Sequence, residues 1–524
     1  MLTYEEIPRD FNLTTYFVDR NVAEGHGNNT ALIGPSGSCT YAELAELVNR
    51  IGNVLRSLGV KQEARVLLAL ADSVEFVATW YAVLKVGGVT AEVYTYLNPS
   101  DYVHYITYTR AEVVVVDEVT LEKFRAVRSA SPYLRLLLVK GVPSAQLQAG
   151  EVSLDELMAD VPDELDAAPT TRDDIAIWKF TTGSTGRPKA CVHAMYSPLL
   201  SYEAYARGVL DVRTDDVVLP VPKLFFGYAR DLTALYPFGV GGAGIAFPER
   251  TTPEKIFELI ERHRPTILVN VPTMMRAMLD HPDAPRQDLS CLRLCTSAGE
   301  ALPESLRGQW MDTFGVEVLD GIGSSEMYHI YISNRPGDVR PNSLGTLVPG
   351  YDASIVDERG RELPDGESGR LWVRGPTAAL MYWNDRAAST RTFAGDLVMS
   401  ADLFERDREG YFHYRGRADD LLKVGGIWVA PAEIEACLSS HPDIVECAVV
   451  GIDREGLTLS CAYVVTHAGT RLAEQDVIEF ARGRLSPQKL PREIRFIDKL
   501  PRTGSGKIDR SDLRDRMVAV GVGE

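Results

Sequence analysis

Short apolar runs alternate with amphipathic segments along most of the chain up to residue 350, and this alternation restricts the fold more than any other feature. Thr40-Tyr41-Ala42-Glu43 has the pattern of a helix-capping box, which predicts a helix running to about Leu58 and stopping at Gly59. Strand-like runs at 66–70, 112–117, 134–140 and 266–271 alternate with helical patterns at 74–85, after Thr252-Pro253 and after Pro272-Thr273. Short runs rich in Val, Ile and Leu are typical of buried parallel strands. The pattern predicts an α/β fold with more than one sheet.

The pattern changes near residue 350. Asp352–Val356, Gly369–Arg374 and Tyr411–Tyr414 are separated by turn sequences, which favours a small antiparallel β region. After Arg417 the helix–strand alternation resumes. A chain of 524 residues exceeds what one hydrophobic core usually serves. We therefore predict a large multi-sheet N-terminal domain at 1–418 and a small α+β domain at 419–524, with the boundary at Asp419.

Composition excludes several classes of protein. Apolar residues make up 45% and charged residues 24%, as in ordinary globular proteins. No apolar stretch approaches the roughly 20 residues that cross a bilayer, and the polar start MLTYEEIPRDF lacks the features of a signal peptide. A net charge of −18 disfavours nucleic acid and anionic membranes as partners. Seven scattered cysteines argue against a disulfide framework. A cytoplasmic location is predicted.

TTGSTGRPK, Thr181 to Lys189, follows the apolar run Ile175–Phe180. Its spacing is not that of a Walker loop, because Gly183 and Gly186 are followed by Arg187-Pro188-Lys189. Glycines let backbone N–H groups converge on phosphate oxygens, hydroxyls add donors, and the lysine adds a charge. The loop alone leaves two interpretations open, a phosphate cradle or a solvated flexible turn.

Five stretches together carry a resemblance. They are TTGSTGRPK at 181–189, SAGEALP at 297–303, DGIGSSE at 320–326, YRGRADDLLKVGG at 414–426 and PRTGSGK at 501–507. In this order and spacing the chain resembles the adenylate-forming superfamily of acyl-CoA synthetases, nonribosomal adenylation domains and luciferases. KLFFGYA at 223–229, GSSEMYHIYISNRPG at 323–337 and LVPGY at 347–351 are most similar to benzoate and hydroxybenzoate CoA ligases. The family fold has a mobile C-terminal domain, and its hinge coincides with Asp419.

The resemblance implies a two-step reaction and a set of site residues. A carboxylate attacks ATP to give an acyl-adenylate and pyrophosphate, and coenzyme A then displaces AMP. Lys507 resembles the adenylation lysine, Glu326 the ligand of Mg²⁺, and Ser325 a contact of the α-phosphate. Lys189 belongs to the phosphate loop. The other implied ATP and AMP contacts are Thr181, Thr182, Gly183, Ser184, Thr185, Gly186, Ala298, Gly299, Glu300, Asp320, Gly321, Ile322, Asp402 and Arg417.

The resemblance also implies an acyl pocket and a coenzyme A tunnel. Gly425 and Gly426 match the strip that lines the tunnel. The pocket residues implied are Phe226, Gly227, Tyr228, Val271, Tyr328, His329 and Ile330. Aromatic runs are also common in plain cores, so that interpretation stays open. An apolar wall with few polar groups favours an aryl or bulky hydrophobic acid.

Two further features resemble functional motifs but are better explained as structural. Gly239 to Gly244 match G-x-G-x-x-G, but a strand-like run and Pro248 follow instead of a helix, so a packed glycine turn is predicted. His193 and His329 are lone histidines, a type that is more often structural than catalytic.

The sequence departs from the family pattern at four places. Ala190 replaces a glycine after the phosphate loop, and Ser400-Ala401-Asp402 replaces Thr-Gly-Asp. Arg230-Asp231 stands where benzoate ligases carry small or apolar residues, which puts a benzoate-sized pocket in doubt. Leu459-Ser460 replaces a Lys-Pro-like pair near the expected thioester-forming face.

Two other functions compete with the CoA ligase. One is an acyl-adenylate synthetase that passes its acyl group to a carrier protein or a separate enzyme. The other is a non-enzymatic homologue, which the presence of Lys507, Glu326 and Lys189 argues against. A homodimer is kept as an alternative to a monomer.

Overall fold

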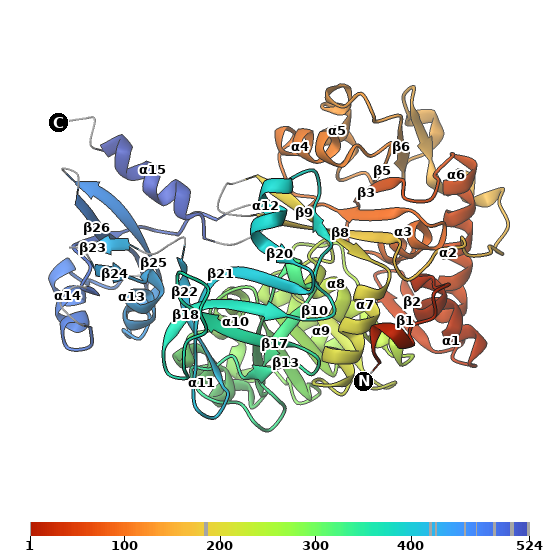
Figure 1. The fold of residues 1–524 in the computed structure, drawn as a ribbon. Coiled ribbons are helices and arrows are strands. Elements are labelled where there is room, and N and C mark those ends of the chain that lie inside the picture. The colour runs from red at the N-terminus through yellow and green to blue at the C-terminus, as the bar shows by residue number, and fades with distance from the viewer. Residues whose placement is uncertain are drawn as a thin grey trace.

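In the computed structural model, the residues that are described form an α/β fold with five sheets (Figure 1). It describes residues 2–182, 187–418, 422–424, 427–454, 457–467, 469–485, 489–502 and 508–520. Among these residues, no helix combines the length and the apolar character that crossing a bilayer requires.

A nine-stranded sheet forms one half of the N-terminal region, in the order β16-β15-β14-β13-β12-β10-β11-β1-β2. Its central strands are parallel, from β1 through β11, β10, β12 and β13 to β14. The strands are β1 Thr30–Gly34, β2 Gly37–Thr40, β10 Val217–Pro220, β11 Ala243–Ile245, β12 Ile267–Asn270, β13 Leu294–Ser297, β14 Val318–Gly323, β15 Ile330–Ser333 and β16 Thr346–Leu347. Of these strands, β10, β11, β12 and β13 are almost wholly buried, as is typical of parallel strands.

An eight-stranded sheet forms the other half, in the order β19-β9-β8-β4-β3-β5-β6-β7. Its strands are β3 Arg65–Ala69, β4 Val89–Glu92, β5 Val113–Val116, β6 Leu136–Val139, β7 Glu151–Ser153, β8 Ile175–Thr182, β9 Pro188–Ala194 and β19 Met381–Tyr382. The strands from β8 through β4, β3, β5 and β6 to β7 are parallel, whereas β8 and β9 form an antiparallel hairpin.

Antiparallel and C-terminal sheets follow, as the change near residue 350 predicts. The five-stranded sheet contains β17 Asp352–Val356, β18 Ser368–Arg374, β20 Phe393–Ala394, β21 Leu397–Arg406 and β22 Phe412–Arg417. The C-terminal strands are β23 Leu422–Val424, β24 Ile427–Val429, β25 Ile444–Arg454, β26 Leu457–Thr466 and β27 Glu493–Phe496. In the described part of the chain these last five strands pair only with one another. The boundary at Asp419 stays a prediction, because 419–421 lie outside the described residues.

Fifteen α-helices lie in the described residues. They are α1 Arg20–Ala23, α2 Tyr41–Ser57, α3 Val74–Lys85, α4 Pro99–Thr109, α5 Leu121–Arg125, α6 Leu154–Ala159, α7 Tyr196–Ser201, α8 Gly227–Ala234, α9 Pro253–His263, α10 Pro272–Leu279, α11 Glu304–Phe314, α12 Arg386–Thr392, α13 Pro431–Leu438, α14 Glu474–Arg482 and α15 Arg510–Val520. The capping box at Thr40 is present: Thr40 Oγ1 accepts from the N–H of Glu43 at 3.3 Å, and the Glu43 carboxylate accepts from the N–H of Thr40 at 2.8 Å.

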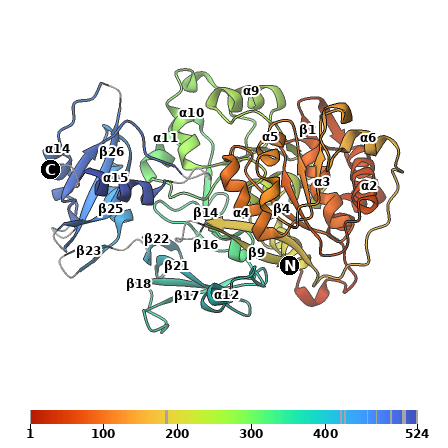
Figure 2. The same ribbon diagram turned by 90° about the horizontal axis from the view of Figure 1, so that it is seen from above.

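The parallel strands determine where the site lies. Because parallel strands present their carboxyl ends at one edge, the segments after β10, β12, β13 and β14 meet there. Figure 1 shows the C-terminal helices α13, α14 and α15 at one end of the molecule, away from α2 and α6, and Figure 2 shows α14 and α15 at that end as well. Gly239, Gly241 and Gly242 precede β11 and Gly244 lies within it, so a strand and not a helix comes directly after the turn, as predicted.

Gly244 tests how tightly α8 packs on the sheet. A Cβ at Gly244 would lie 2.1 Å from the carbonyl oxygen of Thr233 in α8. We expect Gly244→Ala to lower the melting temperature, because such overpacking costs about 1–3 kcal/mol. Gly308→Ala is the matched control: apart from the backbone of its own helix α11 and its chain neighbours, no atom lies within 4 Å of its Cβ position, and alanine should gain about 0.5–1 kcal/mol in a helix. Thermal unfolding that moves both variants in the same direction would contradict this packing.

Candidate active site

The predicted phosphate loop is the turn of the β8–β9 hairpin. Thr181 pairs with Lys189 and Thr182 with Pro188, so the two strands close on the loop from both sides. Gly183, Ser184, Thr185 and Gly186 lie outside the described residues. The apolar run before the loop is a strand, as predicted. Ala190 is fully buried opposite Phe180 in the ladder, so its methyl group faces the core.

Glu326 and Lys189 share one neighbour, Tyr382. The Tyr382 hydroxyl donates to Glu326 Oε1 at 2.7 Å, and the Lys189 ammonium lies 5.3 Å from the centroid of the Tyr382 ring. Lys189 also pairs with Asp385 at 3.8 Å. Burial, followed by the charge of Glu326, raises the pKa of Tyr382, so this hydroxyl stays a donor. The structure therefore brings the predicted metal carboxylate and the loop lysine together at the hairpin.

His193 is structural in this arrangement. Its Nε2 lies 2.7 Å from the backbone oxygen of Ser325. A carbonyl oxygen only accepts, so Nε2 carries the proton and donates. Burial lowers the pKa of His193 to about 3, which keeps the ring neutral. The ring thus positions Ser325, whose hydroxyl donates to the carbonyl oxygen of Phe180 at 3.5 Å.

The predicted adenine-framing residues follow β13 and lie on β14. Ala298 is buried, and Gly299 has a φ of +89°, a conformation that favours glycine. The Glu300 carboxylate accepts from the Thr273 hydroxyl at 2.6 Å. Asp320 is buried, and burial raises its pKa to about 8.

Gly321 and Ile322 continue β14 and pair with β15. Gly321 lies opposite Ser333, and Ile322 lies opposite Ile332. A Cβ at Gly321 would lie 2.8 Å from the carbonyl oxygen of Ile332, so this position accommodates only glycine without a shift of the backbone.

The predicted ribose carboxylate is prearranged. Asp402 lies opposite Arg417 in the β21–β22 ladder, and Arg417 donates to Asp402 Oδ1 at 3.0 Å. The Ser400 hydroxyl donates to Asp402 Oδ2 at 2.9 Å and accepts from the N–H of Asp402 at 2.8 Å. The changed turn at Ser400-Ala401 therefore supplies its own support for the carboxylate.

The predicted acyl-pocket residues lie side by side. The rings of Phe226 and Tyr228 have centroids 6.2 Å apart, and Tyr228 and His329 are 5.7 Å apart. The Cβ position of Gly299 lies 4.0 Å from the Phe226 ring. The Tyr228 hydroxyl is 2.7 Å from Thr296 Oγ1. Burial lowers the pKa of His329 to about 3.

The other pocket residues occupy element ends. Val271 immediately precedes α10, Gly227 is the first residue of α8, and Ile330 begins β15. Tyr328 is buried, with a positive φ of +68°.

Arg230 and Asp231 do not stand as free charges in this pocket. Both are buried and belong to an ionic quartet with Glu92 and Lys179. The sequence reasoning missed Lys179, Glu92 and Tyr382. Lys179 left a signal, since it is a charge within the apolar run Ile175–Phe180. Tyr382 left none.

Several predicted residues fall outside the described part of the chain: Lys507, Gly425, Gly426 and Asp419. The segment that leads to Lys507 is described as far as Arg502. Arg502 donates to the Thr273 hydroxyl at 3.3 Å, and that hydroxyl bonds to Glu300. The start of the PRTGSGK stretch therefore contacts the adenine-side residues. Leu459 and Ser460 lie in β26, opposite Ile452 and Gly451.

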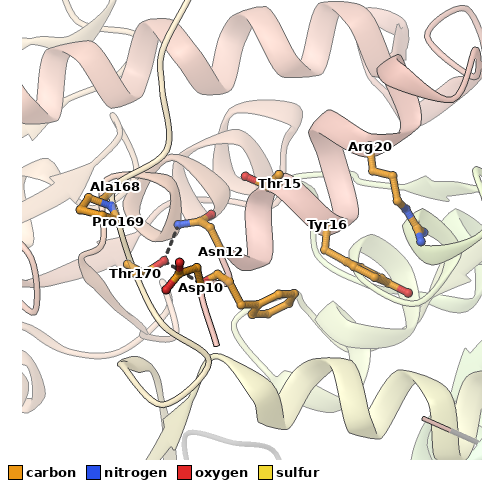
Figure 3. A pocket seen from close by; sticks show the side chains of 9 residues that line it. Asp10, Asn12, Thr15, Tyr16, Arg20, Ala168, Pro169 and Thr170 are labelled. Carbon is orange, nitrogen blue, oxygen red and sulfur yellow. Dashed lines mark hydrogen bonds between the residues drawn. The ribbon is translucent and has the colours of Figure 1, made fainter. Parts of the chain in front are cut away.

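A surface pocket of about 400 Å³ lies elsewhere, where the N-terminal segment meets residues 168–170 (Figure 3). Asn12 donates to Thr170 Oγ1 at 3.1 Å in its wall. None of the predicted site residues lines this pocket. Among the described residues, no group of three or more His, Cys, Asp or Glu side chains is arranged to hold a metal ion.

Comparison with known proteins places this arrangement among adenylate-forming enzymes. The AMP-binding enzyme family matches residues 19–383, and the AMP-binding enzyme C-terminal domain matches 433–507. The chain belongs to the AMP-binding enzyme family, as the five motifs indicate.

Two relatives named as CoA ligases match this chain along almost their whole length. A benzoate–CoA ligase of Thauera aromatica is 41% identical, with 97% of each chain covered. A 4-hydroxybenzoate–CoA/benzoate–CoA ligase of Rhodopseudomonas palustris is 37% identical over 97% of this chain and 94% of the relative. The resemblance to this subgroup is confirmed, and the chain is an AMP-forming acid–thiol ligase.

Solved structures agree with this assignment. The anthranilate CoA ligase AuaEII in complex with anthranoyl-AMP has a TM-score of 0.94 and 34% identity, over 99% of this chain and 100% of that one. A benzoate CoA ligase from Burkholderia xenovorans LB400 has a TM-score of 0.88 and 38% identity, over 96% and 100%. The predicted fold class, a large multi-sheet N-terminal region with a smaller C-terminal one, is confirmed.

The variant Tyr382→Phe tests the role of the Tyr382 hydroxyl separately from that of its ring. It keeps the ring beside Lys189 and removes the donor to Glu326. Because a hydrogen bond to a charged group contributes about 1.5–3 kcal/mol, we expect the KM for ATP in pyrophosphate exchange to rise about tenfold to a hundredfold. Tyr411→Phe is the control, since its hydroxyl also donates to a carboxylate, Asp338, at 2.8 Å. Equal KM values in both variants would rule out a role of Tyr382 in ATP binding.

Proposed function

We propose that this chain joins an aromatic carboxylic acid to coenzyme A through an acyl-adenylate formed from ATP. The observation that carries the proposal is the position of Gly299. It follows β13 beside Glu300 on the predicted adenine side, and its Cβ position lies 4.0 Å from the Phe226 ring on the acyl side. An acid seated against Phe226, Tyr228 and His329 would therefore have its carboxylate next to the nucleotide. The relatives that act on benzoate and hydroxybenzoate support an aryl acid.

The reaction needs no covalent enzyme intermediate. In the first step a carboxylate oxygen of the acid bonds to the α-phosphorus, and the bond from that phosphorus to pyrophosphate breaks. In the second step the thiol sulfur bonds to the acyl carbon, and AMP leaves. The protein therefore acts by positioning and by stabilising charge. In this proposal Asp402 and Arg417 bind the ribose, and Ser325 contacts the α-phosphate.

Glu326 has the chemistry that a magnesium ion requires. Mg²⁺ prefers carboxylate oxygens and is commonly bound by one or two carboxylates together with substrate phosphates. The Glu326 carboxylate is partly buried beside the phosphate hairpin, and Tyr382 fixes one of its oxygens. When bound, the ion would neutralise charge on the ATP phosphates. Lys189 would contribute a second positive charge on the same side.

The C-terminal region supplies the remaining parts of the proposal. Residues 419–524 form the mobile domain with its hinge at Asp419, Lys507 assists adenylation, and Gly425 with Gly426 lines the tunnel for coenzyme A. The contact of Arg502 with Thr273 supports this, because it brings the segment before Lys507 to the site. Coenzyme A is preferred to a carrier protein as the acceptor, since the benzoate and hydroxybenzoate relatives described above are CoA ligases. A cytoplasmic location and a homodimer remain predictions.

A panel of carboxylic acids tests the proposed substrate. Benzoate, hydroxybenzoates, aminobenzoates and bulky aliphatic or polycyclic acids are assayed for ATP–pyrophosphate exchange and then for the CoA thioester, with and without a carrier protein. Burial of a matched ring contributes about 1.5–3 kcal/mol, so aryl acids should lead by tenfold or more. A bulky aliphatic acid more than a hundredfold above every benzoate in kcat/KM would overturn the aryl proposal and leave adenylation intact.

Lys507→Ala is expected to abolish adenylation and spare thioester formation from supplied acyl-adenylate. The physical reason is that a lysine on a mobile domain reaches the reacting phosphate in only one orientation of that domain. Pyrophosphate exchange measures the first step, and release of AMP from added acyl-adenylate with coenzyme A measures the second. Equal loss of both activities would contradict the assignment.

A further inference from the structure

A strained turn separates the two halves of the candidate site. Tyr328 has φ +68° and ψ −55°, and the N–H of His329 donates to the carbonyl oxygen of Met327 at 2.8 Å. This is a γ-turn with positive φ, which is rare and strained. Glu326 lies just before the turn, and His329 ends it. Any change in the turn would therefore move the predicted metal carboxylate relative to the acyl pocket.

The side chain of Lys179 holds this turn at two points. Its ammonium donates to the carbonyl oxygen of Tyr328 at 2.6 Å. The same nitrogen lies 3.5 Å from the centroid of the Tyr328 ring, within the range of a cation–π interaction. Lys179 is buried in β8, two residues before Thr181, where the phosphate hairpin begins. It therefore connects the hairpin to the strained turn.

The charge of Lys179 is balanced inside the protein. Asp231 Oδ2 accepts from Lys179 at 2.5 Å, and Asp231 Oδ1 accepts from Arg230 at 2.9 Å. Arg230 also donates to Glu92 Oε2 at 2.7 Å. The two cations and two anions are all buried. A buried charge that lost its partner would be strongly unfavourable, so the four side chains act as one unit.

Lys179 also packs behind the acyl pocket. A Cβ on Gly227 would lie 2.8 Å from both Cε and Nζ of Lys179. The first residue of α8 therefore has the lysine directly behind it, and Asp231 is one helical turn further along the same face. One ammonium group thus contacts the start of α8, the quartet and the turn.

We propose that Lys179 is a positioning residue for adenylation, whose ammonium holds the Met327–Tyr328–His329 turn and so sets Glu326 and His329 relative to each other. This rests on the proposed function, since it assigns those two residues to the ATP and acyl sides. Buried ion pairs often add little to stability. A structural role and a positioning role therefore predict different outcomes when the quartet is rebalanced.

The ionisation of the lysine gives an additional test. Burial lowers the pKa of Lys179 to about 8, and the charge of Asp231 opposes this effect. Asp231, Arg230 and Glu92 face it within the quartet. The other titratable neighbours are Tyr328, His193, His329 and Cys191, which lies opposite Lys179 in the β8–β9 ladder. Burial raises the pKa of Cys191 well above its usual value, so its thiol stays protonated. Both histidines have a pKa of about 3, so their rings are uncharged at pH 7 and above. As pH rises through about 8 the ammonium loses its charge, so exchange should fall on that side.

Three variants are compared in ATP–pyrophosphate exchange, which does not involve the thiol of coenzyme A. Lys179→Met removes the ammonium and leaves the quartet unbalanced. Lys179→Met/Asp231→Asn removes it and restores neutrality, because Arg230 and Glu92 still pair. Lys85→Met is the control. Lys85 is another buried lysine, paired with Asp19 at 2.8 Å on α3 and outside the predicted site.

We expect Lys179→Met to lower kcat for exchange about tenfold to a hundredfold, the range that releasing one strained backbone residue allows. The double variant should regain the melting temperature of the wild type but not its kcat. Its exchange rate should no longer fall above pH 8. Lys85→Met should lose melting temperature and keep kcat. Recovery of wild-type kcat in the double variant, or equal kcat loss in Lys85→Met and Lys179→Met, would overturn the proposal.

The acid used is the best substrate of the wild-type enzyme. Failure of the aryl proposal would appear in the wild type as exchange with a different acid. Failure of the present proposal would appear only in the comparison among variants. The two outcomes are therefore distinguishable.

Discussion

The site depends on one constraint of parallel sheets, that neighbouring parallel strands end at the same edge. Phe226 follows β10, Val271 follows β12, Ala298 follows β13, and Glu326 follows β14. These residues are separated by long stretches of sequence, yet the sheet brings them together without a dedicated contact for each. The hairpin β8–β9 comes from the other large sheet and carries the predicted phosphate loop. The candidate site therefore lies where the two sheets meet.

The ionic quartet joins the two sheets at that point. Glu92 and Lys179 belong to β4 and β8 of the eight-stranded sheet, whereas Arg230 and Asp231 belong to α8, between β10 and β11 of the nine-stranded one. Removing one member of such a buried network costs far more than removing a surface pair. The relative position of the sheets is thus restrained by charge beside the hairpin, while apolar packing restrains it elsewhere.

Local patterns predicted the elements because their causes are local. The capping box at Thr40, the apolar run before Thr181 and the stop after Gly244 all appear as expected. The family resemblance supplied the site residues, and the structure places most of the described ones together.

What sequence could not supply was the partner of each charge. From the sequence, Arg230 and Asp231 were expected to alter the acyl pocket, because one sequence does not show that Glu92 and Lys179 pack against them. The contact between Tyr382 and Glu326 was likewise not visible in the sequence. It forms because the two-residue strand β19, which contains Tyr382, pairs with β9. For Ala190, the ladder register decides that the methyl group faces the core.

The charged side chains of the candidate site fall into two groups, which differ in whether a ligand could replace one partner of an ion pair. Asp402 pairs with Arg417, and Lys189 pairs with Asp385, each pair being partly exposed. Such pairs exchange partners at little cost, because surface ion pairs contribute only about 0–1 kcal/mol. A ligand can therefore replace one partner without leaving a buried charge unpaired. The quartet around Lys179 is closed and buried, so no ligand exchanges with it. In a chain with a net charge of −18, the proposed site would thus bind an anion through the first group, while the second would hold the surrounding backbone in place.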